Sequence, residues 1–123
     1  MPDAAVPTFG SVALDCPDPA ALAAFYARLL DWPLTPDAGD DEWINLLAPG
    51  GGTHLAFQRA ADFVAPTWPQ PDVQQQLHID FEVADLDAAH ERAVGLGARH
   101  LDTQGSFRVY ADPVGHPFCL CQE

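Results

Sequence analysis

Lysine is absent from this 123-residue chain, and its five cationic side chains are all arginines, against eighteen Asp and Glu residues. Without lysine, the chain cannot form a Schiff base with a carbonyl substrate. The formal net charge of −13 gives an acidic surface that repels phosphate groups, so we expect no nucleic-acid partner.

Long apolar runs are also missing, because no stretch approaches the roughly 20 residues that a membrane-spanning helix needs. We therefore expect no membrane insertion. The segment Met1–Ala5 has neither the basic nor the apolar region of a secretory signal. The three cysteines, Cys16, Cys119 and Cys121, are an odd number, which favours reduced thiols over a disulfide framework. Together these features predict a cytoplasmic protein.

Apolar residues make up 48% of the chain, enough for a packed core, and they follow short regular patterns. Residues Thr8–Cys16 alternate between the two faces of a half-buried strand. Asp18 and Pro19 then supply an N-cap and a first helical residue, and apolar side chains recur every three or four positions. This predicts a helix over residues 18–31. Short strands are expected to follow at Trp32–Thr35, Asp41–Ala48 and Thr53–Gln58.

The second half of the chain repeats this order. Residues 60–76 are rich in proline and glutamine, which predicts a linker between two halves. The alternating run Leu77–Val83 predicts a strand, and Asp85 caps a helix expected over residues 85–96. Three more strands are expected at Ala98–Leu101, Phe107–Ala111 and Pro117–Gln122.

The two halves align at one constant offset, which places Val12 on Ile79 and Asp18 on Asp85. We therefore predict one α+β domain over residues 1–123, made of two tandem βαβββ modules at about 8–59 and 77–122. Since one such unit cannot cover its own sheet, the pair should form a curved mixed sheet with helices outside and a cleft inside. The face with Val12 and Ile79 should meet the helices, and the face with Ser11 and His78 should line the cleft.

Three motifs stand out: Phe25–Trp32 (FYARLLDW), Leu77–Val83 (LHIDFEV) and Asp112–Leu120 (DPVGHPFCL). They resemble the FYxxxLG helix end, the start of the second module and the DPxGxxxEL ending of the vicinal oxygen chelate superfamily, which includes glyoxalases, bleomycin-resistance proteins and dioxygenases. The segments TWP, LHxD and DPxGxxFCL are similar to those of a glyoxalase-like subfamily common in actinobacteria. The resemblance covers about Thr8 to Gln122 and implies the two-module fold with its central cleft.

Metal-dependent relatives hold a divalent ion with residues from the first and last strands of each module. The resemblance carries those positions onto Ser11, Ala56 or Gln58, His78 and Cys119. Because only one of the four is a good ligand for Mg²⁺, Mn²⁺ or Fe²⁺, we expect no complete metal centre and no cofactor. Zinc is the exception, because it accepts soft donors. If zinc binds, we expect its ligands to be His78, Gln58, Cys119 and Cys121.

The predicted cleft face supplies the candidate site residues. His78 is expected to be a general base, a ligand contact or a structural histidine, while Cys119 and Cys121 are expected to be core residues, metal ligands or reactive thiols. Carboxylates on this face are expected to be proton shuttles, or acids that reach solvent or pair with Arg59 or Arg108. Aromatic side chains there would contact a planar or apolar ligand, or pack within the protein. The expected ligand-binding set is Ser11, Trp43, Gln58, Trp68, His78, Asp80, Tyr110 and Cys119, with Asp15 and Glu82 as further acids.

Two functions from different classes remain open. The first is a metal-poor protein that binds a small, partly apolar molecule. The second is an enzyme, a lyase, isomerase or epimerase, that transfers a proton with His78 as base, with or without a divalent metal. A dioxygenase ranks third because the set of two histidines and one carboxylate is missing. We also expect a homodimer, with Trp68 and its neighbouring prolines near the interface.

Overall fold

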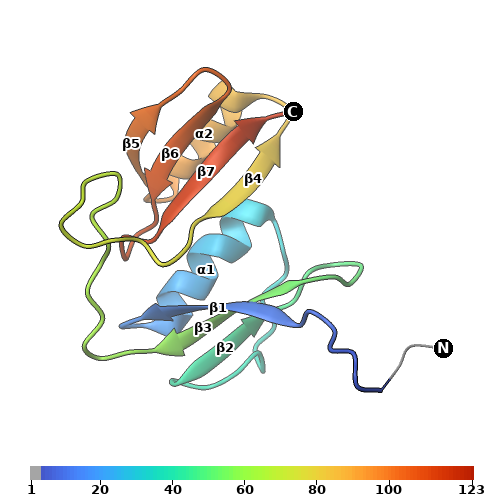
Figure 1. Ribbon diagram of the computed structural model, residues 1–123. Helices are drawn as coiled ribbons and strands as arrows, with labels where there is room; N and C mark the ends of the chain where they lie inside the picture. Colours follow the sequence, from blue (N-terminus) through green and yellow to red (C-terminus); the bar gives the residue numbers. More distant parts are fainter. Residues whose placement is uncertain (1–3) are drawn as a thin grey trace.

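The computed structural model describes residues 4–123 (Figure 1). The first three residues of the segment Met1–Ala5, on which the prediction of no secretory signal rests, lie outside this described part. Within residues 4–123, two helices and seven strands follow one another. In order they are β1 (Ser11–Cys16), α1 (Pro19–Leu30), β2 (Trp43–Leu46), β3 (His54–Arg59), β4 (Ile79–Val83), α2 (Leu86–Gly95), β5 (Arg99–Thr103), β6 (Phe107–Ala111) and β7 (Pro117–Gln122).

The strands form two mixed sheets with the same connectivity. In the first sheet the order is β1-β3-β2, and in the second it is β4-β7-β6-β5. In each, the first strand pairs in parallel with the last, and the last pairs antiparallel with the strand before it. In Figure 1, β1 and β4 are the strands drawn nearest to the opposite sheet, and the linker crosses between the sheets at one end. The predicted two-module α+β fold is confirmed.

Both helices begin as the sequence predicts. The carboxylates of Asp18 and Asp85 accept hydrogen bonds from the backbone N–H groups of Ala21 and Ala88. These are N-caps that satisfy free donors of the first helical turn. The predicted helices over 18–31 and 85–96 are therefore confirmed to within a residue at each end.

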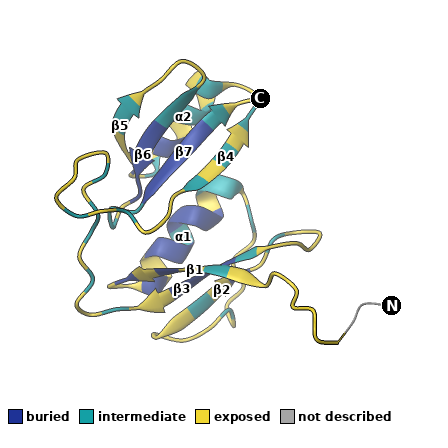
Figure 2. Ribbon diagram, in the orientation of Figure 1, coloured by how far each residue is buried: buried dark blue, intermediate teal, exposed yellow. Residues whose placement is uncertain are grey.

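The core lies between the helices and one face of each sheet. Tyr26 of α1 is fully buried, and its ring lies 5.8 Å from that of Phe57 in the first sheet and 6.2 Å from that of Phe118 in the second. The alternation of β1 and β4 thus turns Val12 and Ile79 toward the helices, as predicted. Figure 2 shows the buried residues concentrated in α1 and in the central strands β6 and β7.

The strand predicted at Trp32–Thr35 is wrong. This segment has no strand structure, so the first module has three strands where the second has four. Pro33 and Pro36 lack the N–H groups that a strand ladder needs, which explains the loss. At the free edge of β2, the described chain has a single isolated antiparallel bridge, between Gly39 and Ile44.

The linker packs against the turn between β6 and β7. A Cβ atom on Gly115 would lie only 2.6 Å from the Cβ of Ala65, and Gly115 has φ +105°. Only glycine tolerates both the close approach and this backbone conformation. Gly115 therefore allows the linker to lie directly on the second module.

Candidate functional site

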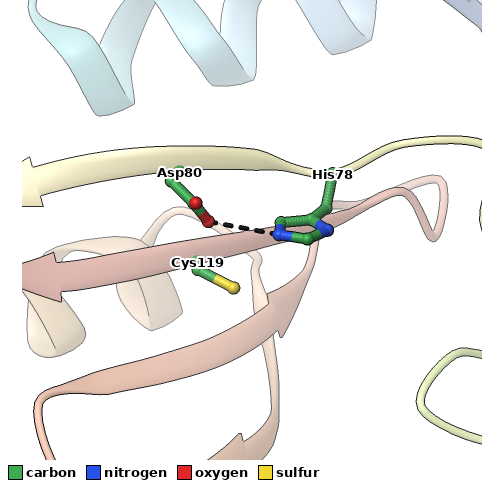
Figure 3. Close-up of side chains that lie close together, drawn as sticks. All are labelled: His78, Asp80 and Cys119. Atoms are coloured by element: carbon green, nitrogen blue, oxygen red, sulfur yellow. Dashed lines mark ion pairs between the residues drawn. The ribbon is translucent and has the colours of Figure 1, made fainter.

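Three potential ligating groups gather at the start of the second module. His78 directly precedes β4, and Asp80 lies in β4. Cys119 on β7 is the register partner of Asp80. Their ligating atoms all lie within 4.8 Å of one another, and within residues 4–123 this is the one such group of three. Figure 3 shows the carboxylate of Asp80 and the sulfur of Cys119 pointing toward the imidazole of His78.

The imidazole of His78 has contacts on both nitrogens and on one ring face. Its Nε2 lies 3.3 Å from Asp80 Oδ1, and its Nδ1 lies 3.2 Å from the side-chain oxygen of Gln75. The indole of Trp68 stacks on the ring at a centroid distance of 5.4 Å and an interplanar angle of 6°. These three contacts hold the ring in one orientation.

Cys119 is buried, and this burial, reinforced by the negative charge of Asp80, raises the pKa of its thiol to about 12. A thiol with such a pKa stays protonated near neutral pH and is a poor nucleophile. Cys121, two residues further along β7, also has a raised pKa, caused mainly by burial. A cation would have to displace the Cys119 proton in order to bind the sulfur.

Several predicted site residues lie elsewhere. Ser11 in β1 and Gln58 in β3 are exposed residues of the first sheet, and Ala56 is a buried residue without a donor group. Trp43 of β2 donates a hydrogen bond of 2.8 Å from Nε1 to Asn45. The four ligand positions implied by the resemblance are therefore split between two sheets, with donors concentrated in the second.

The expected placement of Tyr110 in the cleft is wrong. Tyr110 is fully buried, pairs with Phe118 across β6 and β7, and stacks on it at 5.4 Å. Its hydroxyl lies 2.7 Å from Nδ1 of His90 in α2. The register of the strands therefore turns Tyr110 toward the helices, away from His78 and Asp80.

A cavity of about 430 Å³ lies where β1, the linker and the segment before β4 meet. Its apolar lining comes from residues of β1 and the linker region: Ala13, Leu14, Ala60, Phe63, Val64, Pro66 and Leu77. Its polar lining adds two acids, two amides and one imidazole: Asp15, Asp62, Gln74, Gln76 and His116. The cavity and the His78 cluster share the segment that runs from residue 74 to residue 78.

His116 closes the cavity at the second module. Its Nε2 lies 2.6 Å from the backbone oxygen of Asp15, and its ring lies 4.9 Å from that of Phe63. His116 is not among the site residues expected from the sequence, and Trp68 is the one linker residue in that set. The linker has no periodic pattern, so only its aromatic and acidic side chains, such as the half-buried Phe63 and the exposed Asp62, could have pointed to this wall of the cavity.

The donor set near His78 partly fits the divalent ion that this fold class often holds. An imidazole, a carboxylate and a thiol are donors that zinc accepts. The set differs from the one expected from the sequence, since Asp80 supplies the carboxylate. Of the expected ligands, Gln58 lies in the other sheet and Cys121 pairs with Glu82 further along β4.

Two helices and two mixed sheets of three and four strands match the fold of the vicinal oxygen chelate class of proteins. The profile of one family within it, described as a glyoxalase-like domain, matches residues 11–121. The chain therefore belongs to the glyoxalase-like domain family. No curated protein sequence matches it.

Solved structures agree with this fold. A glyoxalase/bleomycin resistance protein/dioxygenase family enzyme from Burkholderia phytofirmans PsJN superposes with a TM-score of 0.71 at 14% identity, covering 91% of this chain and 95% of the other. A glyoxalase/dioxygenase from Nostoc punctiforme gives 0.70 at 18% identity, with 100% and 95% covered. TnmS3, an antibiotic binding protein from Streptomyces sp. CB03234, gives 0.63 at 19% identity, with 98% of each chain covered.

The described chain contains no helix that is long and apolar enough to cross a membrane.

Proposed function

We propose that this protein binds a small, partly apolar molecule in the cavity between β1 and the linker. The observation that carries the proposal is the cavity itself, whose volume of about 430 Å³ lies within the range of small-molecule sites. Its lining combines apolar side chains with a few polar groups, which is the usual composition of such sites. The description of TnmS3 as an antibiotic binding protein adds support from a protein of the same fold.

Binding can be measured with N-phenyl-1-naphthylamine, an uncharged dye whose fluorescence rises in apolar surroundings. We expect saturable binding of about one dye per chain. Ala13→Phe should abolish it, because Ala13 lines the cavity and a phenyl ring would fill part of it. Ser11→Phe is the matched control, because Ser11 lies two residues earlier on the same face of β1 and does not line the cavity.

Amide NMR spectra locate the dye. Shifts confined to the cavity, including Phe63 and Gln76, are expected in the wild type and in Ser11→Phe. Dye binding that is unsaturable, or that survives unchanged in Ala13→Phe, would contradict the proposal.

The second candidate is proton transfer by His78, and the pair that His78 forms with Asp80 at 3.3 Å favours it. A carboxylate beside an imidazole fixes its tautomer and its orientation, which is the arrangement of an oriented general base. In this role the enzyme would be a lyase, isomerase or epimerase. Proton transfer by His78 is tested with the variant His78→Gln. Any lyase, isomerase or epimerase activity found in the wild type should be lost in this variant, while dye binding in the cavity is retained.

If a zinc-like ion binds, His78, Asp80 and Cys119 would hold it, and it would supply Lewis acidity beside the base. The protein's own part is to orient His78 through Gln75 and Trp68 and to keep the Cys119 thiol buried. Elemental analysis of purified protein tests this. We expect well under one equivalent of Mn, Fe, Co or Ni, and any zinc present should be lost in His78→Ala and kept in Cys16→Ala.

A homodimer stays a prediction of the sequence and the family. Trp68 lies on His78 within the chain, so other exposed apolar side chains are better placed for contact with a second copy. Phe9 is 73% exposed and Leu47 is 55% exposed, and both flank strands of the first sheet. Light scattering at micromolar concentration should give about twice the chain mass, and Phe9→Asp should shift the protein toward monomer.

A further inference from the structure

We infer that the cavity between β1 and the linker selects ligands that carry a positively charged amine on an apolar body. This inference rests on the proposed function, because it names the chemical class of the ligand for the same cavity. It depends on three features of the lining: two carboxylates, the absence of any permanent cation, and exposed apolar side chains beside them.

The carboxylates come from two different segments. Asp15 belongs to β1 and Asp62 to the linker, and both residues line the cavity. Within the described chain, no side chain forms an ion pair with either carboxylate or donates a hydrogen bond to it. Both groups are therefore free to pair with a ligand.

None of the five arginines lines this cavity. Arg92 donates hydrogen bonds to backbone oxygens at the end of α1, and Arg108 forms an ion pair of 2.6 Å with Asp87. Arg59 and Arg99 line other surface depressions. His116 is the one titratable base in the lining, and its Nε2 is engaged with the backbone oxygen of Asp15. The local charge of the cavity is consequently negative.

Apolar side chains next to these acids remain uncovered. Val64 is 68% exposed and Leu77 is 40% exposed, although both line the cavity. A ligand with an apolar body would remove this surface from water, which favours binding. The ring of Phe63 also offers an aromatic face, which attracts ammonium groups as well as apolar ones.

The polar remainder of the lining suits an amine too. The side-chain oxygens of Gln74 and Gln76 can accept hydrogen bonds from an ammonium group beside the two carboxylates. The net charge of −13 adds a long-range attraction for cations that weakens as salt is added. An anionic ligand would meet unpaired carboxylates and no guanidinium group, so its binding is disfavoured.

Three naphthalene derivatives with matched bodies test the inference: 1-naphthylmethylamine, 1-naphthylmethanol and 1-naphthoate. Calorimetry in dilute buffer measures their affinities, and amide NMR shifts at Phe63 and Gln76 locate them. We expect the amine to bind about tenfold more tightly than the naphthoate, with the alcohol between them, because partly exposed charge pairs contribute up to about 1 kcal/mol each. Added salt should weaken binding of the amine alone.

Asp15→Asn combined with Asp62→Asn should reduce this preference to within about twofold, since both paired charges are removed while the volume of the cavity is kept. The matched control combines Asp37→Asn with Glu91→Gln. It changes the net charge equally, at exposed positions that do not line the cavity, and should keep the preference.

The outcomes separate the two proposals. Equal affinities of the wild type for all three ligands would overturn the amine inference and leave the proposed function standing. A preference that survives in the Asp15→Asn, Asp62→Asn variant would also overturn it, because overall charge would then be the cause. Failure of all three ligands to bind in the cavity would overturn the proposed function as well.

Discussion

The phenol of Tyr26 in α1 donates a hydrogen bond of 2.7 Å to Oδ2 of Asp112, 86 residues later, and both side chains are buried. The other carboxylate oxygen accepts the backbone N–H groups of Val114, Gly115 and His116, each at 3.0 Å. One carboxylate therefore joins the helix of the first module to the turn of the second. Burial raises the pKa of both Asp112 and Tyr26.

Removing the phenol oxygen should weaken the connection between the modules. We expect Tyr26→Phe to lower the free energy of unfolding by about 2 kcal/mol, because a buried carboxylate loses a hydrogen-bond donor that nothing replaces. Urea denaturation measures the change. Combining Tyr26→Phe with Asp112→Asn should cost less than the sum of the two single changes, and strict additivity would show that the two groups are not coupled.

The end of α1 offers a stabilising change. Asp31 has φ +55°, a left-handed conformation that glycine adopts without strain, and its negative charge lies at the negative end of the helix dipole. Asp31→Gly should therefore stabilise the protein by about 0.5–1 kcal/mol. Thermal unfolding would measure this, and Asp31→Asn separates the charge from the backbone effect. A lower melting temperature in Asp31→Gly would contradict the argument.

Much of the fold could be predicted because its causes are local. The alternation in Thr8–Cys16 and the caps at Asp18 and Asp85 are set by neighbouring residues, and the structure has the corresponding strand and helices. The predicted strand at Trp32–Thr35 failed for a local reason too, since Pro33 within it and Pro36 directly after it cannot donate to a ladder.

The site was harder to predict because its parts meet only through tertiary structure. The run Phe107–Ala111 has no polar alternation, so the face of Tyr110 depends on its pairing with Phe118. Asp80 joins His78 and Cys119 through the register of β4 with β7. The cavity forms where the aperiodic linker lies beside β1, and no pattern within either segment encodes that contact.

Alkaline pH should destabilise the protein through Cys16. Burial, and then the charges of Asp112, Asp18 and Asp15, raises the pKa of this thiol to about 11 from its usual value of 9.0. Between these values the folded chain holds a proton that the unfolded chain has lost, so the free energy of unfolding falls as pH rises. The contribution is about 1.4 kcal/mol for each pH unit within that window.

Urea denaturation at about pH 8 and about pH 10.5 compares the free energy of unfolding below this window with its value near the upper end of the window. Other buried thiols and phenols with raised pKa values, such as Cys119, change stability in the same direction, so the comparison must be made between variants. Cys16→Ala should lose less stability than the wild type between the two pH values. An equal loss in both proteins would show that Cys16 is not responsible.

Gly115 should affect both the stability of the protein and the shape of the cavity. Gly115→Ala places a Cβ atom 2.6 Å from the Cβ of Ala65, and it does so at φ +105°, where side chains are strained. The linker would have to move away from the turn, and the linker supplies one wall of the cavity. We expect a loss of stability of about 1–3 kcal/mol together with weaker binding of N-phenyl-1-naphthylamine.

The clash and the backbone strain can be separated with a second substitution. Ala65→Gly removes the atom that the new methyl group meets and leaves φ at residue 115 unchanged. The double variant should therefore recover dye binding while keeping part of the stability loss, because the linker can return to the turn but the strained backbone remains. Ala65→Gly alone is the control and should bind the dye like the wild type. Wild-type dye affinity in Gly115→Ala would mean that the contact between linker and turn does not shape the cavity.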